Sequence, residues 1–234
     1  MPGIIEYSNH GRQNIVNDIV IHCRGIYGPG TRELCYGANR PDPFTSPSTQ
    51  RKPIFGRDNF KEAFTTDFFG KGVTLEQISQ LLWAAQGIAD RKDNIDLRTA
   101  PSSGALYPME LYVLTREGLF HYVPKGHYVE TVRKEDMRAE LSAMALHQEV
   151  IKFAPMTIVI SAVYQRVTDE YGQRGERYTH MEAGHIAQNI HLQAVSLGLS
   201  SVPMGAFEDK KVKNLLSLPP DQEPLYIISV GYAD

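Results

Sequence analysis

Residues 182–198 read EAGHIAQNIHLQAVSLG, and this stretch decides the fold class that we expect for the chain. Its apolar side chains recur three and four positions apart, the spacing that places them on one face of an α-helix. They are Ala183, Ile186, Ile190, Ala194 and Leu197. Gly198 then supplies a helix stop, because glycine adopts the left-handed conformation in which many helices end. We therefore expect a long core helix over residues 182–197.

Helix and strand patterns alternate along the chain from residue 58. Residues 74–77 read TLEQ, a capping box whose Thr and Gln side chains bond each other's backbone amides and so begin a helix. That helix is expected to end at a left-handed Gly87, before a polar loop at residues 90–96. Further helices are expected at residues 60–66, 134–151 and 210–216, and strands at residues 109–114, 119–123, 156–163 and 225–230. This order predicts an α+β domain with a mixed, largely antiparallel sheet flanked by helices.

The first 57 residues differ in composition from the rest of the chain. Proline, glycine, serine and asparagine interrupt any periodicity there, apart from a short apolar stretch at residues 15–21. We therefore expect an N-terminal arm or extension over residues 1–57 and one domain over residues 58–234.

Charge and composition exclude several classes of partner. The chain has 24 Lys and Arg against 27 Asp and Glu, a formal net charge of −3, so we expect no nucleic-acid partner. No apolar run approaches the roughly 20 residues that cross a bilayer, so we expect no membrane span.

Cys23 and Cys35 are the only cysteines, and His180, His185 and His191 do not share a helix face, so we expect neither a disulfide scaffold nor a metal site. A cytoplasmic location follows as the default.

Two segments rich in small residues are candidates for ligand binding. The first, PSSGALYP at residues 101–108, follows the basic residue Arg98 and precedes a strand. Its hydroxyls, its glycine and its backbone amides suit the edge of a planar ligand. The second, VPMGAF at residues 202–207, follows the Gly198 helix stop. From spacing alone, a plain turn is the alternative for each segment.

Five segments taken in order resemble the flavin-dependent nitroreductase superfamily. They are TLEQISQLLWAAQG (74–87), RTAPSSGALYPMEL (98–111), EAGHIAQNIHLQA (182–194), LGLSSVPMGAF (197–207) and PLYIISVG (224–231). Within the superfamily they are most similar to the SagB-type dehydrogenases, whose best-known members oxidise thiazolines and oxazolines in ribosomal peptides. The likeness spans residues 74–231, about two thirds of the chain.

The resemblance implies a nitroreductase-like homodimer with FMN bound at each of two sites between the subunits. The cofactor-binding residues that it implies in the described motifs are Arg98, Ser102, Ser103, Gly104, Met204, Gly205 and Ala206. The two serines and Gly104 would contact the flavin, and Gly205 and Ala206 would line the edge that carries N5, the atom that exchanges hydride. A backbone donor there stabilises the reduced flavin without adding a competing base.

The chain departs from the superfamily at the expected phosphate grip. Members usually carry an Arg-Arg-Ser-x-Arg motif about ten residues before the segment that matches residues 73–75, whereas residues 63–67 read AFTTD and contain no cation. The phosphate of FMN needs charge-assisted donors from elsewhere. The candidates, in order of preference, are Arg24, Arg57, Arg51 and Lys52. A solvated side chain without a ligand is the alternative for each.

A second departure concerns catalysis. Azoline oxidases of the subgroup commonly have a Lys-Tyr pair shortly before the long helix, and the corresponding pair here is Glu170-Tyr171. Tyr171 is therefore a candidate proton donor or acceptor, and Glu170 is a candidate base if burial raises its pKa. A solvated loop carboxylate is the alternative for Glu170.

The resemblance as a whole implies an FMN-dependent oxidoreductase. Its substrate would be peptide-derived or another natural product, with azoline-type oxidation as one form, and its electrons would pass to O₂ or another acceptor. An NAD(P)H-dependent reductase of nitro compounds or quinones on the same scaffold is the alternative enzyme. The missing Arg motif and the missing Lys leave a flavin-free partner or binding protein of the same fold as a further alternative.

Overall fold

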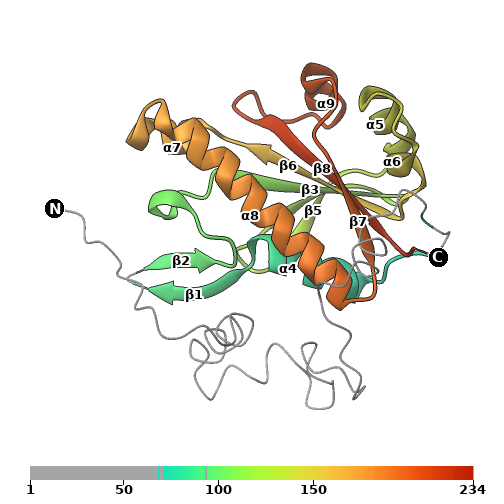
Figure 1. Cartoon of the computed structure of the whole chain (residues 1–234), viewed down its shortest axis with the longest axis horizontal. Coiled ribbons are helices and arrows are strands. Elements are labelled where there is room, and N and C mark those ends of the chain that lie inside the picture. Colours follow the sequence, from blue (N-terminus) through green and yellow to red (C-terminus); the bar gives the residue numbers. More distant parts are fainter. Residues whose placement is uncertain (1–67, 69–70, 93, 234) are drawn as a thin grey trace, which may run out of the picture. The chain divides into compact units, whose positions relative to one another are not determined.

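An antiparallel sheet of six strands forms the centre of the part of the chain that the structure describes (Figure 1). The structure is a computed structural model, and it describes residues 68, 71–92 and 94–233. The strands of this sheet are β3 (Met109–Thr115), β4 (Gly118–Val123), β5 (Tyr128–Arg133), β6 (Met156–Ala162), β7 (Ser200–Met204) and β8 (Glu223–Gly231). Their order is β5-β4-β3-β6-β8-β7, and every neighbouring pair is antiparallel. The predicted α+β fold is confirmed, and the sheet, expected to be mixed and largely antiparallel, is antiparallel throughout its described strands.

β6 is buried along its whole length. It reads MTIVISA, and all seven residues are buried. Its β-branched side chains favour an extended backbone and pack well on a pleated surface. β3 and β8 bond to its two edges, so only its faces remain to be covered. A strand of this kind therefore requires helices on both faces of the sheet.

Alternate residues of the central strands point to opposite faces and meet different helices. The helices are α4 (Leu75–Gln86), α5 (Arg138–Met144), α6 (Glu149–Phe153), α7 (Gln165–Tyr171), α8 (Arg174–Ser196) and α9 (Asp209–Leu215). Ile158 and Ile160 pack in one core with side chains of α4 and α8. Val159 and Ile227 pack in a second core with side chains of α5, α6 and α9. Figure 1 shows α8 lying across the sheet, so the fold has a helix layer on each face.

The long helix α8 begins earlier than the sequence predicts. It spans Arg174–Ser196, 23 residues, whereas we expected a helix over residues 182–197. Its end is confirmed, with Leu197 as the cap and Gly198 at a φ of 69°. The first two turns read RGERYTHM and carry no apolar stripe, so periodicity gives no helix signal there. They are nevertheless ordered by packing, because Gly175 lies against the backbone of α7.

Several local expectations are wrong. Gly87 is extended rather than left-handed, and glycine is needed there because a Cβ would collide with the Trp83 side chain. Residues 90–92 and 95–96 of the expected polar loop belong instead to an antiparallel pair of strands, β1 (Ile88–Lys92) and β2 (Ile95–Arg98). The expected helix at residues 134–151 is replaced by α5 and α6, with Leu146 and His147 at positive φ between them. Polar hairpins and short helices of this kind lack a hydrophobic period.

The sequence also failed to predict β5, β7 and α7. All six residues of β5 are exposed, so no alternation of polar and apolar residues marks it. β7 contains Pro203, which disfavours a strand, but it lies at the edge of the sheet, where proline is tolerated. Only Val167 is buried in α7.

The predicted arm over residues 1–57 and the predicted helix over residues 60–66 lie outside the described residues. The domain boundary at residue 58 therefore stays a prediction. Among the described helices, none is both long enough and apolar enough to cross a membrane.

Gly175→Ala should lower the free energy of unfolding by about 1–3 kcal/mol, as overpacking does. A Cβ at this position would lie 2.8 Å from the Thr168 amide nitrogen, a backbone atom that cannot rotate away. Gly184→Ala is the matched control on the same helix, since no atom lies within 4 Å of its Cβ. Alanine favours a helix over glycine, so the control should gain about 0.5–1 kcal/mol. Urea denaturation measures the free energy of unfolding of both variants. Equal stability of the two would contradict the close packing of α7 on α8.

Candidate active site

The segment between β2 and β3 has an unusual backbone. Gly104, Ala105 and Tyr107 have φ angles of 62°, 53° and 47°, all in the left-handed region that favours glycine. The first of them belongs to the Ser-Ser-Gly loop, which we define as residues 102–104. Left-handed residues other than glycine are costly and persist only where surrounding contacts hold them. The contacts of Tyr107 show what holds this segment.

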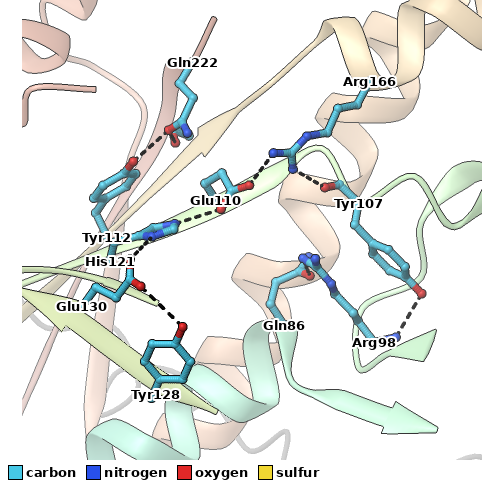
Figure 2. A network of polar contacts seen from close by, with 11 residues as sticks. Gln86, Arg98, Tyr107, Glu110, Tyr112, His121, Tyr128, Glu130, Arg166 and Gln222 are labelled. Atoms are coloured by element: carbon cyan, nitrogen blue, oxygen red, sulfur yellow. Dashed lines mark hydrogen bonds and ion pairs between the residues drawn. The ribbon is translucent and has the colours of Figure 1, made fainter. Parts of the chain in front are cut away.

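Every polar atom of Tyr107 is bonded. Its N–H donates to Ser102 Oγ (2.9 Å), its hydroxyl accepts from the Arg98 N–H (3.0 Å), and its carbonyl accepts from Arg166 Nη1 (2.9 Å). The Arg98 guanidinium also lies 4.5 Å from the centroid of the Tyr107 ring, within the range of a cation–π contact. Figure 2 shows Arg166 and Arg98 approaching Tyr107 from its two ends. Arg98 and Arg166 thus fix Tyr107, which lies just after the Ser-Ser-Gly loop.

A second set of hydrogen bonds runs from Arg98 through Gln86 to Glu182 of α8. Arg98 Nη1 donates to Gln86 Oε1 (2.8 Å), and Gln86 Nε2 donates to Glu182 Oε1 (3.4 Å). Glu182 is only 3% exposed. Burial raises the pKa of Glu182 to about 7, against the opposing effect of Ser102, Gln86 and the Arg98 charge.

Glu110, at the start of β3, anchors the second arginine. Arg166 Nη2 lies 2.7 Å from Glu110 Oε1, and His121 Nε2 lies 2.9 Å from Glu110 Oε2. Burial by itself raises the pKa of Glu110, but the hydrogen bond from His121 and the charge of Arg166 outweigh it and hold this pKa below its usual value. Figure 2 shows the connection from Arg166 through Glu110 to His121. Glu110 therefore remains a carboxylate and keeps Arg166 directed at Tyr107.

Tyr171 and the Ser-Ser-Gly loop, both predicted from the sequence, lie next to each other. Tyr171 ends α7, and its hydroxyl would lie 3.0 Å from a Cβ placed on Gly104. Its ring also stacks edge to face on Tyr178, with centroids 5.3 Å apart. Tyr171 is 38% exposed, so its hydroxyl is held near the loop without being buried. Glu170 is exposed on α7, and the burial on which its role as a base depends is not seen in the described chain.

The segment at residues 204–206 lies elsewhere. Met204 ends β7 and is buried in the core shared with α5, α6 and α9. The Ala206 carbonyl accepts from Gln148 Nε2 (2.9 Å), and Gly205 is exposed with no atom within 4 Å of an added Cβ. β8 and β6 separate β7 from β3, which follows the Ser-Ser-Gly loop. The two segments implied by the resemblance therefore adjoin strands that two other strands of the sheet separate.

The remaining points from the sequence concern the phosphate grip and metal binding. Arg24, Arg51, Lys52 and Arg57 lie outside the described residues, so the phosphate grip stays a prediction. Among residues 68, 71–92 and 94–233, no group of three or more His, Cys, Asp or Glu side chains is arranged to hold a metal ion.

Sequence reasoning missed the residues that hold the loop. They are Gln86, Glu110, Arg166 and Glu182, which reach Tyr107 directly or through Arg98. One signal was present for Glu182, which precedes Ile186 and Ile190 by four and eight residues and so shares their buried helix face. Charged residues are almost never fully buried unless they are paired, so a carboxylate on an apolar stripe indicates a partner.

Residues 67–232 match the model of the Nitroreductase family. The chain is 39% identical over 177 residues to "Putative nitroreductase MJ1384" of Methanocaldococcus jannaschii, a match that covers 73% of this chain and 87% of that protein. It is 25% identical over 134 residues to the "Microcin B17-processing protein McbC" of Escherichia coli, which covers 52% of this chain and 48% of that protein.

Solved structures share the fold. A Ralstonia eutropha protein described as a "putative nitroreductase" superposes with a TM-score of 0.67 at 29% identity, covering 83% of this chain and 87% of that chain. The Escherichia coli microcin synthetase McbBCD complex gives 0.65 at 20% identity, covering 93% and 92%. The NADPH:FMN oxidoreductase of Vibrio harveyi gives 0.55 at 23% identity, covering 73% and 65%. At these identities the last two matches support the fold alone.

Tyr107→Phe should lower the free energy of unfolding by about 1–3 kcal/mol, because the half-buried Arg98 N–H loses its acceptor. Tyr128→Phe is the control. Its hydroxyl makes one exposed contact with Glu130 at 3.4 Å, so stability should hardly change. Chemical denaturation of the two variants and the parent provides the measurement. If Tyr107→Phe proves as stable as Tyr128→Phe, the loop does not depend on this bond.

Proposed function

The chain belongs to the nitroreductase family, and from that premise we propose that it is an oxidoreductase that uses FMN. The Ser-Ser-Gly loop carries the proposal. Its side chains are small, and Gly104 leaves the space beside the Tyr171 hydroxyl open, since a Cβ there would come within 3.0 Å of it. A backbone held rigidly by charged groups and free of bulky side chains suits a flat ring that must approach closely. The residues present therefore fit an isoalloxazine.

FMN, when bound, supplies hydride exchange at its N5 atom. The chain's own residues supply position and protons. Ser103 and Gly104 would bind the ring, while Arg98 and Arg166 keep the loop in place through Tyr107. Tyr171, whose hydroxyl borders the loop, would hold the proton that the substrate gains or loses. Glu170 beside it is a candidate for passing that proton to solvent, because it is exposed.

We further propose that the active form is a homodimer. In one chain the Ser-Ser-Gly loop and residues 204–206 lie on different parts of the sheet, so a site that uses both needs a second copy. α8 offers a surface for it, because Met181, Leu192 and Val195 are large apolar residues that are exposed. Their spacings of 11 and 3 residues place them on one face of the helix.

The substrate that we propose is peptide-derived or another natural product, oxidised by loss of a hydride and a proton. The similarity to McbC supports this class, because that protein is named for processing microcin B17. Azoline-type oxidation is the specific form that the SagB-type resemblance favours. The Lys of the SagB-type pair is replaced by Glu170, so Tyr171 alone would retain the proton-transfer role of the pair.

An NAD(P)H-dependent reductase of nitro compounds or quinones is the second candidate. It is favoured by the relative from Methanocaldococcus jannaschii, which is the more similar of the two relatives and is named as a nitroreductase. Anaerobic mixing with NADH or NADPH distinguishes the two functions. Rapid bleaching of the flavin supports the reductase, whereas a flavin that stays oxidised supports the dehydrogenase.

Purified protein mixed with FMN and then separated from unbound flavin should retain an absorption band near 450 nm, and Ser103→Tyr should lose that band while the fold is retained. The tyrosine ring would fill the space that the isoalloxazine needs. Ser103→Ala is the control and should bind FMN within about threefold of the parent, since one neutral hydrogen bond is worth about 0.5–1.5 kcal/mol. Stoichiometric flavin in Ser103→Tyr would show that the loop is not the site. A parent that binds no flavin would support the flavin-free alternative.

Leu192→Arg should dissociate the dimer, because it places a charge in the apolar centre of the proposed interface on α8. Sedimentation at micromolar concentration should give about twice the chain mass of 26.3 kDa for the parent and one chain mass for the variant. Val132→Arg, at an exposed position of β5, is the control and should remain dimeric. A monomeric parent that binds FMN would overturn the dimer proposal.

A further inference from the structure

Tyr171 is the candidate proton donor of the proposed site, and its hydroxyl is held only indirectly. Its ring stacks edge to face on Tyr178 of α8, with centroids 5.3 Å apart. Its hydroxyl lies next to Gly104 but makes no hydrogen bond to another residue in the described part of the chain. The position of this hydroxyl therefore depends on how α7, which ends with Tyr171, is held in place.

The helix α7 has little hydrophobic packing of its own. Of its seven residues, only Val167 is buried. Most helical stability in proteins comes from the packing of an apolar face, so polar contacts must hold a helix of this kind. On the side of α8, Gly175 packs against the α7 backbone, and the Tyr164 hydroxyl, just before α7, lies 2.7 Å from His180 Nε2. These contacts do not fix α7 relative to the Ser-Ser-Gly loop.

Two hydrogen bonds connect the start of α7 to the segment that follows the loop. The Val163 N–H, two residues before the helix, donates to the Pro108 carbonyl (2.8 Å). In the first turn of the helix, Arg166 Nη1 donates to the Tyr107 carbonyl (2.9 Å). The first bond is between backbone groups and does not depend on the side chain at residue 163. Arg166 therefore supplies the side-chain bond between α7 and this segment.

The orientation of the Arg166 guanidinium is set by Glu110. Arg166 Nη2 lies 2.7 Å from Glu110 Oε1, and the other oxygen of this carboxylate lies 2.9 Å from His121 Nε2. Figure 2 shows Arg166 between Tyr107 and Glu110. A guanidinium holds two acceptors in one plane and in fixed directions, whereas a lysine ammonium is a point charge on a flexible stem. An arginine at this position therefore fixes the first turn of α7 relative to both Tyr107 and β3.

Building on the proposed flavin site, on which this inference rests, we propose that Arg166 is the positioning residue of Tyr171. It fixes α7 against Tyr107 so that the Tyr171 hydroxyl faces the ring site at Gly104. Arg166 and Tyr171 are five positions apart, about 7.5 Å along the helix axis, so a shift of the first turn is carried to the last. The Tyr107 N–H donates to Ser102 Oγ (2.9 Å), so one guanidinium places both the loop and the proton donor.

The first test is the fluorescence of riboflavin bound to the full-length protein, measured with protein in excess. A phenol in contact with an excited flavin quenches it by donating an electron, so the emission per bound flavin reports how close Tyr171 lies. The parent should be dim, Tyr171→Phe should be several times brighter, and Arg166→Ala should be as bright as Tyr171→Phe. The double variant should be no brighter than either single variant, because both changes remove the same contact.

Three controls separate positioning from a general loss of structure. Arg177→Ala, at an exposed position of α8, should stay as dim as the parent. Arg166→Lys keeps the charge but not the planar fork, so it should remain bright. Guanidinium ions at a low, non-denaturing concentration should restore quenching in Arg166→Ala, whereas sodium ions at the same concentration should not. Partial unfolding would lower the amount of flavin bound, but it would not change the emission per bound flavin.

The second test needs no flavin. Amide hydrogen exchange measures local opening, and the α7 amides of the flavin-free protein should exchange about tenfold faster in Arg166→Ala, the factor expected for loss of one hydrogen bond. Glu110→Gln should change the same amides in the same direction, because it removes the charge that orients the guanidinium. The amides of the buried strand β6 should exchange as in the parent, and Arg177→Ala should keep the parent rates throughout.

The outcomes separate this inference from the proposed function. An Arg166→Ala variant that is as dim as the parent, or whose α7 amides exchange at the parent rate, overturns the positioning role and leaves the flavin site standing. Quenching that guanidinium does not restore, or that Arg166→Lys retains, also contradicts the role. A Tyr171→Phe variant as dim as the parent overturns this inference and the proton-donor role of Tyr171 together. A parent that binds no riboflavin overturns the proposed function and this inference with it.

Discussion

The packing of α8 across the sheet is the constraint on which the candidate site depends. Ala183, Ile186 and Ile190 fill the core over the central strands, and close packing leaves the helix little freedom to rotate or slide. Glu182 lies at the end of this apolar stripe, so the contacts that fix the helix also fix the carboxylate. Hydrogen bonds through Gln86 and Arg98 then connect this carboxylate to Tyr107. A site built on a loop gains precision when its supporting bonds come from rigid elements in this way.

The loop needs such support because its backbone is costly. Ala105 and Tyr107 hold positive φ angles without being glycine, and that conformation must be stabilised by contacts from outside the segment. Arg98 comes from β2 and Arg166 from α7, so elements on both sides of the loop contribute. Arg166 also connects α7 to Tyr107 and Glu110. The same helix places the Tyr171 hydroxyl next to Gly104. One element, α7, therefore carries both a residue that holds Tyr107 and the candidate proton donor.

The sequence predicted the elements that carry their own hydrophobic period and missed those ordered by their neighbours. α4, β3, β4, β6 and β8 were expected nearly as they are, because each buries a regular set of side chains. β5 is wholly exposed and the first turns of α8 are polar, so pairing and packing, not pattern, create them. In the site, the loop and Tyr171 were predicted, whereas Glu182 was missed because a single helix glutamate resembles a surface residue.

Two arginines hold Tyr107, and they differ in how each is connected to a carboxylate. Arg166 contacts Glu110 directly, at 2.7 Å, and the pKa of Glu110 is held low, so this pair stays charged as the solution is acidified. Arg98 reaches Glu182 only through Gln86, and burial raises the pKa of Glu182 to about 7. A direct contact repays the cost of burying a charge better than a relayed one. The Arg166–Glu110 contact therefore keeps Tyr107 in place as the solution is acidified, while Arg98 contacts the same residue through its guanidinium and its backbone N–H.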